Sequence, residues 1–285
     1  MTDVFGADFL DRLHGAGAVQ NAAAFAALRE RGFPNRRVEA WRYTDLAGPL
    51  GKALTPAGLR INQEQSGLFG PIPPADVAAP ASDQPGTDAL SLLNASLAGE
   101  GFLLDVPEKA RLKPIFARFG PMAENALVNA ANSIRLAEGA QATLVERWGN
   151  TDDSWLNSDT DIDLAPGAHL TRIILVEDGG AGTQTHRTST RLGENARYDC
   201  LVVTLGGGLH RIEQHADINA PGAHAGLAAL VLKTGSEHSD FVTGVRHLAA
   251  DTTSDQQVRT VVDQQATAIF QGGIHVAPDS QRIEG

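Results

Sequence analysis

The chain has 285 residues, 42% of them hydrophobic, a formal net charge of −11 at pH 7 and one cysteine, Cys200. A single cysteine excludes an internal disulfide and is typical of a reducing compartment, while the negative charge argues against a protein that follows nucleic-acid phosphates. Because no secretion signal is recognisable and the longest apolar run, Leu227–Leu232, is too short to span a bilayer, we expect a soluble cytoplasmic protein that binds neither nucleic acid nor membrane.

Residues 1–70 are predicted to form a small helical region. Ala18–Arg31 is rich in alanine and other strong helix formers, and Gly32 followed by Pro34 gives a stop signal. Asp45–Leu54 is expected to begin a second, short helix.

Residues 71–100 are predicted to be a linker that ends in a short helix. Between Pro71 and Gly86 the chain is dense in Pro, Ala and Asp, which is typical of a loop. Asp88–Leu97 is expected to be the helix. The β pattern takes over at Gly101, so residues 101–285 are predicted to form the core.

A turn motif recurs every 28 residues through this core. Ser133–Ala140 (SIRLAEGA) returns as Asp161–Ala168 (DIDLAPGA), fades at 190–196 and recovers at 217–223 with one residue deleted. A last copy, Ile274–Ser280, begins four periods after Ile162. A fixed period of this length indicates stacked units that each bury an apolar face against their neighbours.

Short apolar runs rich in Val, Ile, Leu and Thr follow the turns and are typical of β-strands. They are Gln141–Trp148, His169–Val176, Arg197–Thr204 and Ala225–Leu232, preceded by Phe102–Val106 and Ile115–Phe119. Uniform repeats of strand and turn predict a mainly β fold, a β-solenoid of parallel strands. A sandwich is the alternative, because its turn signals also recur regularly.

The C-terminal end of the repeat lacks a cap. A solenoid normally closes with an atypical unit that hides its last apolar layer, but only five residues, 281–285, follow the last turn. We therefore expect the core to be incomplete at this end, as in a truncated chain. Its exposed last coil is expected to self-associate, because open strand edges pair with other chains.

Histidines are the main candidates for a ligand site. His238 and Asp240 are two residues apart and share one face of an extended strand, so both side chains point in the same direction, as metal ligands do. His247 and His275 are expected to join them from neighbouring coils. The alternative is that all of them are solvated or hydrogen-bonded on the outside of the solenoid.

Other chemically active residues have simpler interpretations. Cys200, on the strand face of Tyr198 and Val202, is a candidate thiolate ligand, but a small buried residue is the commoner role of a free cysteine. His210 and His215 are five apart and fall on opposite strand faces. The run Gly206–Gly208 lacks the Lys-Ser/Thr of a phosphate loop and is predicted to be a tight turn.

Two polar clusters suggest contacts. Arg36, Arg37 and Arg42 alternate with Trp41 and Tyr43, which indicates packing at a helix end or docking of a domain or partner. A second cluster is acidic: Asp152, Asp153, Asp159, Asp161 and Asp163. Because clustered carboxylates serve glycoside cleavage, this cluster supports an alternative function, a β-helix carbohydrate-active lyase or hydrolase.

Two stretches resemble the SufB/SufD family of iron–sulfur cluster assembly proteins. Gly32–Leu46 (GFPNRRVEAWRYTDL) is similar to the N-terminal signature of the SufD branch, in which a Gly-x-Pro turn precedes Glu-x-Trp-Lys/Arg-Tyr-Thr-x-Leu. Lys233–Val276 resembles the core shared by both branches, where His, Thr-Ser, Arg and Phe-x-Gly-x-Ile/Val follow in order. These positions are His247, Thr253, Ser254, Arg259 and Phe270–Ile274. The additional cysteines of the SufB branch are missing.

This resemblance implies a right-handed parallel β-helix behind an N-terminal helical region. It also implies a scaffold subunit without enzymatic activity, which pairs with a SufB-like protein and a SufC-like ATPase. An iron–sulfur cluster would form transiently in the full complex, and we expect this chain to hold no cofactor by itself. The family's Lys-Cys-Ser-His-Gly-Ala-Thr motif and its SufC-binding helices have no match here, so no cluster ligand is transferred to this sequence.

Overall fold

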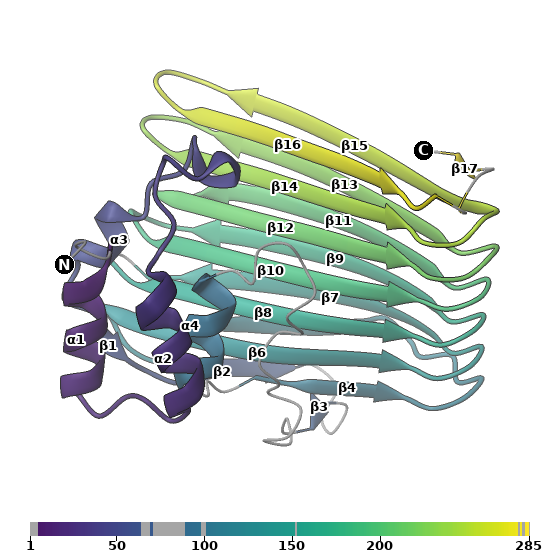
Figure 1. The fold of residues 1–285 in the computed structure, drawn as a ribbon, viewed down its shortest axis with the longest axis horizontal. Helices are drawn as coiled ribbons and strands as arrows, with labels where there is room; N and C mark the ends of the chain where they lie inside the picture. Colours follow the sequence, from purple (N-terminus) through teal and green to yellow (C-terminus); the bar gives the residue numbers. More distant parts are fainter. Residues whose placement is uncertain are drawn as a thin grey trace.

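The computed structural model describes residues 5–63, 69–70, 89–97, 101–151, 153–278, 280 and 283–284. Its main body is a stack of coils, each made of one strand in each of two facing sheets, with helices against one side (Figure 1). The strands pair in parallel except for the antiparallel pairs β2–β5 and β3–β4 at the first coil. The fold is therefore the predicted β-solenoid, because a sandwich would require antiparallel sheets.

The two sheets contain alternate strands of the chain. Sheet A consists of β1 (Thr55–Pro56), β3 (Phe69–Gly70), β4 (Leu103–Val106), β6 (Ala126–Leu136), β8 (Trp155–Leu164), β10 (Thr183–Leu192), β12 (Leu209–Ile218), β14 (His238–His247) and β16 (Thr267–Val276). Sheet B consists of β2 (Leu59–Gln63), β5 (Ile115–Pro121), β7 (Gln141–Asn150), β9 (His169–Asp178), β11 (Arg197–Gly206), β13 (His224–Lys233), β15 (Thr252–Val262) and β17 (Ile283–Glu284). All six predicted strands are present.

The register reproduces the repeat seen in the sequence. Leu127 pairs with Trp155 and Trp155 with Thr183, steps of 28 residues (155 − 127 and 183 − 155). The turns of the motif lie directly above one another: the Gly139 amide donates to the Pro166 carbonyl at 3.0 Å, and the Gly167 amide to the Glu194 carbonyl at 2.8 Å. Gly139 (φ 64°) and Gly167 (φ 67°) adopt the left-handed conformation that this stacking requires.

The lumen between the sheets is packed with side chains. Inward residues of successive strands, such as Leu144, Leu170 and Val202, form one hydrophobic cluster along the stack. In the first coils, aromatic rings stack in a column, and the ring centroids of Phe119 and Trp148 are 4.2 Å apart. Because each coil buries its apolar face on the next, the stack is held together by contacts between neighbours.

Helices lie against the outer face of sheet A, from its first coils up to β12 (Figure 1). They are α1 (Ala7–Gly15), α2 (Ala22–Arg31), the 3₁₀ helix η1 (Glu39–Trp41), α3 (Ala47–Gly51) and α4 (Ala89–Leu97). Phe9, Leu28 and Leu93 pack against Leu127 and Trp155 of the sheet in a second hydrophobic cluster. The predicted helices at 18–31, 45–54 and 88–97 are thus confirmed within a few residues.

Strands begin before residue 70, within the region predicted to be helical. The helices before the first strand end at Gly51, and strands β1 and β2 join the sheets from Thr55 onward. Leu59–Gln63 alternates between buried and exposed side chains and pairs with β5, so it belongs to the solenoid. Most of the linker expected at 71–100, residues 71–88 and 98–100, lies outside the described residues.

The last described coil is open. Strand β16 pairs only with β14 among the described strands, and β15 continues past its short pairing with β17. Large apolar side chains are exposed here, including Val261 (60%), Ile274 (49%) and Phe270 (45%). No helix in the described part of the chain is long and apolar enough to cross a membrane.

Candidate functional site

The segment that follows α2 is anchored to the outer face of sheet A by a cluster of buried polar groups. The Arg211 guanidinium, from β12, lies 3.8 Å from the centroid of the Trp41 ring. Its Nε donates to Glu213 Oε1 at 2.7 Å, and its Nη1 donates to Asp240 Oδ2 on β14. Thr44 Oγ1 donates to the same Asp240 oxygen at 2.5 Å. We call these five residues the anchor cluster.

The charges of the anchor cluster are buried. Arg211 is 2% exposed and Asp240 fully buried. Burial disfavours the charged form of Glu213, but Arg211 and His215 favour it more strongly and lower the pKa of this carboxyl to about 2. A buried ion pair of this kind needs all its partners, because removing one leaves an uncompensated charge in the interior. The anchor cluster therefore fixes the N-terminal segment on the sheet.

The anchor cluster joins the two stretches that carry the family resemblance. Trp41 and Thr44 belong to the N-terminal signature, while Asp240 lies in the second stretch. Gln271, also in the second stretch, donates from Nε2 to Asp240 Oδ1 at 3.0 Å. Trp41, from the aromatic and basic cluster at 36–43, thus docks the N-terminal segment on the sheet. Docking of a domain is one of the roles predicted for this cluster.

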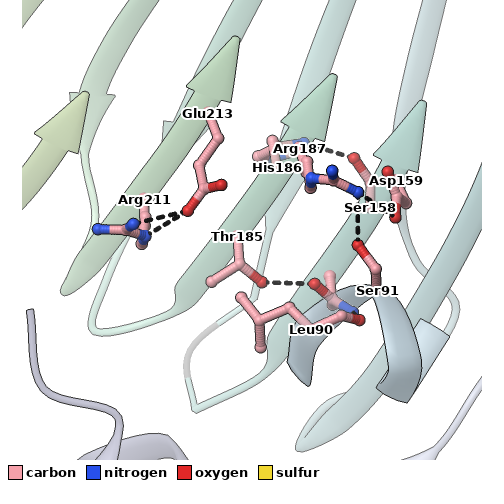
Figure 2. A pocket seen from close by; sticks show the side chains of 10 residues that line it. Leu90, Ser91, Ser158, Asp159, Thr185, His186, Arg187, Arg211 and Glu213 are labelled. Atoms are coloured by element: carbon pink, nitrogen blue, oxygen red, sulfur yellow. Dashed lines mark hydrogen bonds and ion pairs between the residues drawn. The ribbon is translucent and has the colours of Figure 1, made fainter. Parts of the chain in front are cut away.

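A small cavity lies beside the anchor cluster, under α4. Its volume is about 10 Å³, the space of one water molecule, and Ser158, His186, Arg187 and Glu213 are among its lining residues (Figure 2). Arg187 Nη1 donates to Ser91 Oγ at 3.0 Å, which ties β10 to the helix. Burial, and to a lesser extent nearby His210 and Arg172, lower the pKa of His186 to about 3. This ring is therefore neutral at ordinary pH.

The predicted ligand candidates do not come together. His238 and Asp240 share the outer face of β14, but the Asp240 carboxylate already accepts bonds from Arg211, Thr44 and Gln271. His247 cannot join them: alternation along β14 turns it into the lumen, where its ring bonds Thr252 Oγ1 at 2.7 Å and Ser254 Oγ at 3.1 Å. In this structure His247 is therefore not grouped with His238 and Asp240.

His275 is also distant from this pair. It lies opposite Arg246 in the register, whereas Asp240 lies opposite Ile269, six residues earlier on β16. At the rise of a strand this separation is about 20 Å. Among the described residues, no three His, Cys, Asp or Glu side chains are grouped as a metal site would require.

Cys200 lies in the lumen in a polar network. Glu146 accepts from Arg172 Nε at 2.6 Å, and Arg172 Nη1 donates to Thr188 Oγ1 at 2.9 Å. Gln214 continues the network, and its Oε1 accepts a weak bond from the Cys200 thiol at 3.7 Å. Burial raises the pKa of Cys200 to about 11, so the thiolate form that binds metals is disfavoured.

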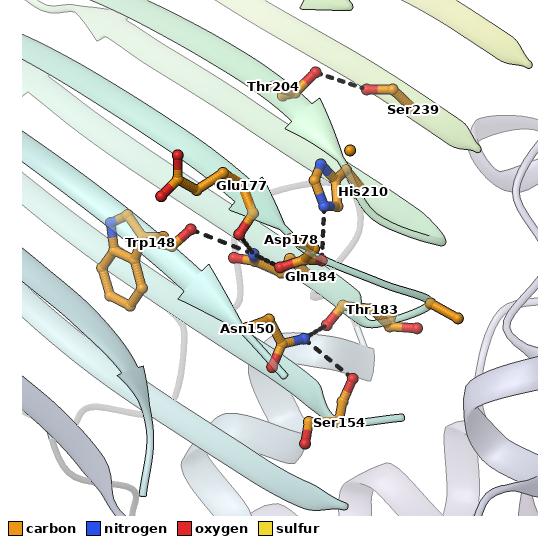
Figure 3. Close-up of polar contacts among 12 residues, drawn as sticks. Trp148, Asn150, Ser154, Glu177, Asp178, Thr183, Gln184, Thr204, His210 and Ser239 are labelled. Carbon is orange, nitrogen blue, oxygen red and sulfur yellow. Dashed lines mark hydrogen bonds and ion pairs between the residues drawn. The ribbon is translucent and has the colours of Figure 1, made fainter. Parts of the chain in front are cut away.

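A second buried network lies at the corner between β11 and β12 (Figure 3). His210 Nε2 is 2.9 Å from Asp178 Oδ2; a carboxylate only accepts, so in the neutral ring Nε2 carries the proton. Nδ1 then accepts from Lys233 Nζ at 3.0 Å. Gly207 (φ 82°) has no room for a Cβ beside the His210 ring, which explains the glycine run predicted to be a turn.

The Glu146–Arg172 pair was not predicted, although the sequence carries a signal for it. Arg172 alternates with Leu170 and Ile174, and Glu146 with Leu144 and Trp148, so both charges occupy positions of the inward face. Arg211 had no such signal. Its neighbours on the outward face of the strand, Glu213 and His215, are also polar, and its partners Trp41 and Asp240 are distant in sequence.

The acidic cluster is largely ion-paired. Asp163 accepts from Arg191 Nε at 2.6 Å, and Asp159 lies 3.7 Å from Arg187. Asp161 stands between them, 3.8 Å from Arg191. Burial, together with the neighbouring Asp159, raises the pKa of Asp161. These contacts give the carboxylates a structural role along sheet A, and Asp152 lies outside the described residues.

Two comparisons relate the chain to known proteins. Residues 119–285 match the model of a family described as "SUF system FeS cluster assembly, SufBD core domain". The chain is also 26% identical over 152 residues to the iron-sulfur cluster assembly protein SufD of Escherichia coli (strain K12). That match covers 53% of this chain and 36% of the relative, so it spans about a third of the relative's length.

Proposed function

The chain belongs to the SufBD core-domain family of the SUF system, and we propose that it is a non-catalytic scaffold subunit for iron–sulfur cluster assembly. In this proposal it pairs with a SufB-like protein and, in the complete assembly, with a SufC-like ATPase. The family match carries the proposal, since it covers more than half of the chain and includes the solenoid strands from β6 to β17.

Two features of the solenoid support a role in assembly. Among the described strands, the ten residues of β16 pair with β14 alone, and an edge of this kind can pair with a strand of a partner chain. Exposed apolar side chains of the same coil, Phe270 and Ile274, would be covered by a partner. The cluster is the cargo of this assembly, and we assign it no ligand in this chain. The single cysteine suits a reducing cytoplasm.

Co-purification tests the proposal. The tagged chain is co-expressed with SufB-like and SufC-like proteins from its own source, and we expect both to elute with it from an affinity column and then from size exclusion. Phe270→Lys, at the open coil, is expected to release the partners. Phe116→Lys is the matched control, because Phe116 is similarly exposed (42%) but lies on β5, at the first coil.

The outcomes are distinct. If neither protein elutes with the unaltered chain, the proposed pairing is overturned. If both variants release the partners alike, pairing occurs but does not use the open coil. Circular dichroism of each variant alone establishes that it is folded.

A further inference from the structure

A row of alternating charges crosses the outer face of sheet A from coil to coil. It takes one residue from each strand from β4 to β16, and each member lies directly opposite the next in the register. In order, the members are Asp105, Arg135, Asp163, Arg191, Asp217, Arg246 and His275. We call this set the charged row. It ends on β16, at the open edge of the sheet (Figure 1).

Neighbouring members of the charged row form paired hydrogen bonds. Arg191 donates to Asp163 from Nε at 2.6 Å and from Nη2 at 2.8 Å. Arg246 donates to both oxygens of Asp217, from Nε at 2.6 Å and from Nη2. Opposite charges that face each other on adjacent strands favour their pairing, whereas like charges oppose it. The charged row therefore contributes to the choice of neighbour for each strand of sheet A.

The alternation stops at the last member of the charged row. Arg246 is followed by His275 and not by an acidic residue. His275 is exposed, and it makes no hydrogen bond or ion pair with the residues that the structure describes. A strand added to the open edge of β16 would lie about 4.8 Å away. A carboxylate on that strand, opposite His275, can accept a hydrogen bond from the imidazole ring and restore the alternation.

The inward face of β16 sets a second requirement for an added strand. Its side chains Phe270, Ile274 and Val276 are exposed, because β14 alone flanks this strand in the described part of the sheet. On earlier strands an acidic member of the charged row stands between two buried apolar residues, as in 162–164 (Ile-Asp-Leu) and 216–218 (Ala-Asp-Ile). A strand with this pattern buries its apolar residues only in one register, since a shift by one residue turns them outward.

We propose that β16 selects a partner strand that runs parallel to it and carries an aspartate or glutamate opposite His275, between two apolar residues. This inference rests on the proposed function, in which β16 pairs with a strand of a partner chain. The parallel direction is that of every described pair in sheet A from β4–β6 onward.

A second copy of this chain is the competing occupant. Its own β16 has no acidic residue on the outward face, which consists of Thr267, Ile269, Gln271, Gly273 and His275. A second copy that pairs through β16 would cover the apolar side chains but would leave the charged row without a carboxylate. An acidic partner strand satisfies both requirements.

The test uses a synthetic peptide with the sequence of β12, residues 209–218 (LHRIEQHADI), acetylated and amidated at its ends. In the proposed register, its Asp217 lies opposite His275 of the chain and its Ala216 opposite Ile274. A second peptide carries Asp217→Lys and is otherwise identical. Each peptide is labelled with a fluorophore and titrated with the full chain at concentrations at which the chain is monomeric. Fluorescence anisotropy then gives the dissociation constants.

We expect the unaltered chain to bind the acidic peptide about threefold more tightly than the lysine peptide, the ratio that one pair of facing side chains provides. His275→Lys should widen this preference to about tenfold, and His275→Glu should reverse it. Thr267→Lys and Thr267→Glu are the matched controls, because Thr267 is exposed on the same face of β16, about 26 Å from His275. Both should keep the preference within about twofold of that of the unaltered chain.

A nitroxide label tests the direction of the added strand. Attached after Ile218 of the acidic peptide, it should broaden the amide NMR signal of Val276 and leave that of Thr267 sharp, because a parallel strand places its C-terminal end beside Val276.

Three results would overturn the proposal. The first is failure of the acidic peptide to bind. The second is the same peptide preference in His275→Lys and His275→Glu. The third is broadening of the Thr267 signal in place of the Val276 signal, which would show antiparallel pairing. Since neither a SufB-like nor a SufC-like protein takes part in this test, its failure is distinguishable from failure of the co-purification.

Discussion

Arg211 shows how single residues hold this molecule together. Its guanidinium contacts an aromatic ring on one side and two carboxylates on the other, and it is almost completely buried. Asp240 accepts from it and also from Thr44, so one carboxylate connects β12, β14 and the N-terminal segment. Removing the arginine would leave the Asp240 charge buried without its main partner.

Arg211→Met is therefore expected to lower the free energy of unfolding by about 3 kcal/mol or more, the cost of breaking a buried ion pair. Arg191→Met is the control, since Arg191 pairs with Asp163 at the surface with 47% of its side chain exposed. Such exposed pairs contribute about 1 kcal/mol or less. Urea denaturation followed by tryptophan fluorescence measures both. Equal losses would contradict the role assigned to the anchor cluster.

At the scale of elements, the solenoid depends on strands that pair with a neighbour on each side. Within the described part of sheet A, strands β8, β10, β12 and β14 each pair with two neighbours. Strand β16 is the exception, because it pairs with β14 alone. Its inward side chain Phe270 stacks on Phe241 at 6.2 Å but is 45% exposed. Unpaired backbone and exposed apolar surface coincide on this strand.

We predict that the isolated chain self-associates through β16, because backbone pairing and apolar burial would both be satisfied by a second copy. Analytical ultracentrifugation should show a dimer whose fraction grows with concentration. Phe270→Lys should shift the equilibrium to monomer, and Phe116→Lys should not. A chain that stays monomeric at high concentration would rule this out.

At the scale of the whole molecule, buried neutral histidines link folding to pH. His186 and His210 are buried, and burial lowers the pKa of both, to about 3 for His186. In the unfolded chain His186 takes up a proton when the pH falls below its ordinary pKa of 6.5. In the folded protein the buried ring stays neutral in this range. The unfolded state thus binds more protons between pH 6.5 and 3, and stability falls as the pH falls through this window.

Between pH 6 and 5 we expect the free energy of unfolding to fall by up to about 1.4 kcal/mol per pH unit for each such histidine. His186→Gln should reduce this slope by up to about 1.4 kcal/mol per pH unit, the equivalent of one proton. Urea titrations at several pH values give the slope. An unchanged slope in His186→Gln would show that this ring is not excluded from protonation by folding.

In sheet B the strands from β5 to β13 were predicted from the sequence, whereas in sheet A only β4 was. Strands such as β9 and β11 alternate apolar inward residues with other residues, and glycine turns bound them. Strand β10 reads TQTHRTSTRL and has no apolar alternation. Its inward side chains join the lumen network, and its outer face lies partly beneath α4, so both faces are buried while the sequence remains polar.

The period of the coil, the parallel stacking of strands and the turns at Gly139 and Gly167 can be inferred from the sequence alone, because they follow from side-chain alternation and backbone conformation within one repeat. The place of the N-terminal segment, the candidate histidines that face outward and the contact of Trp41 with Arg211 are seen only in the folded molecule. These depend on which coil the segment reaches and on the complementary charges it meets there. No local pattern in the sequence encodes a contact between residues 170 positions apart (211 − 41).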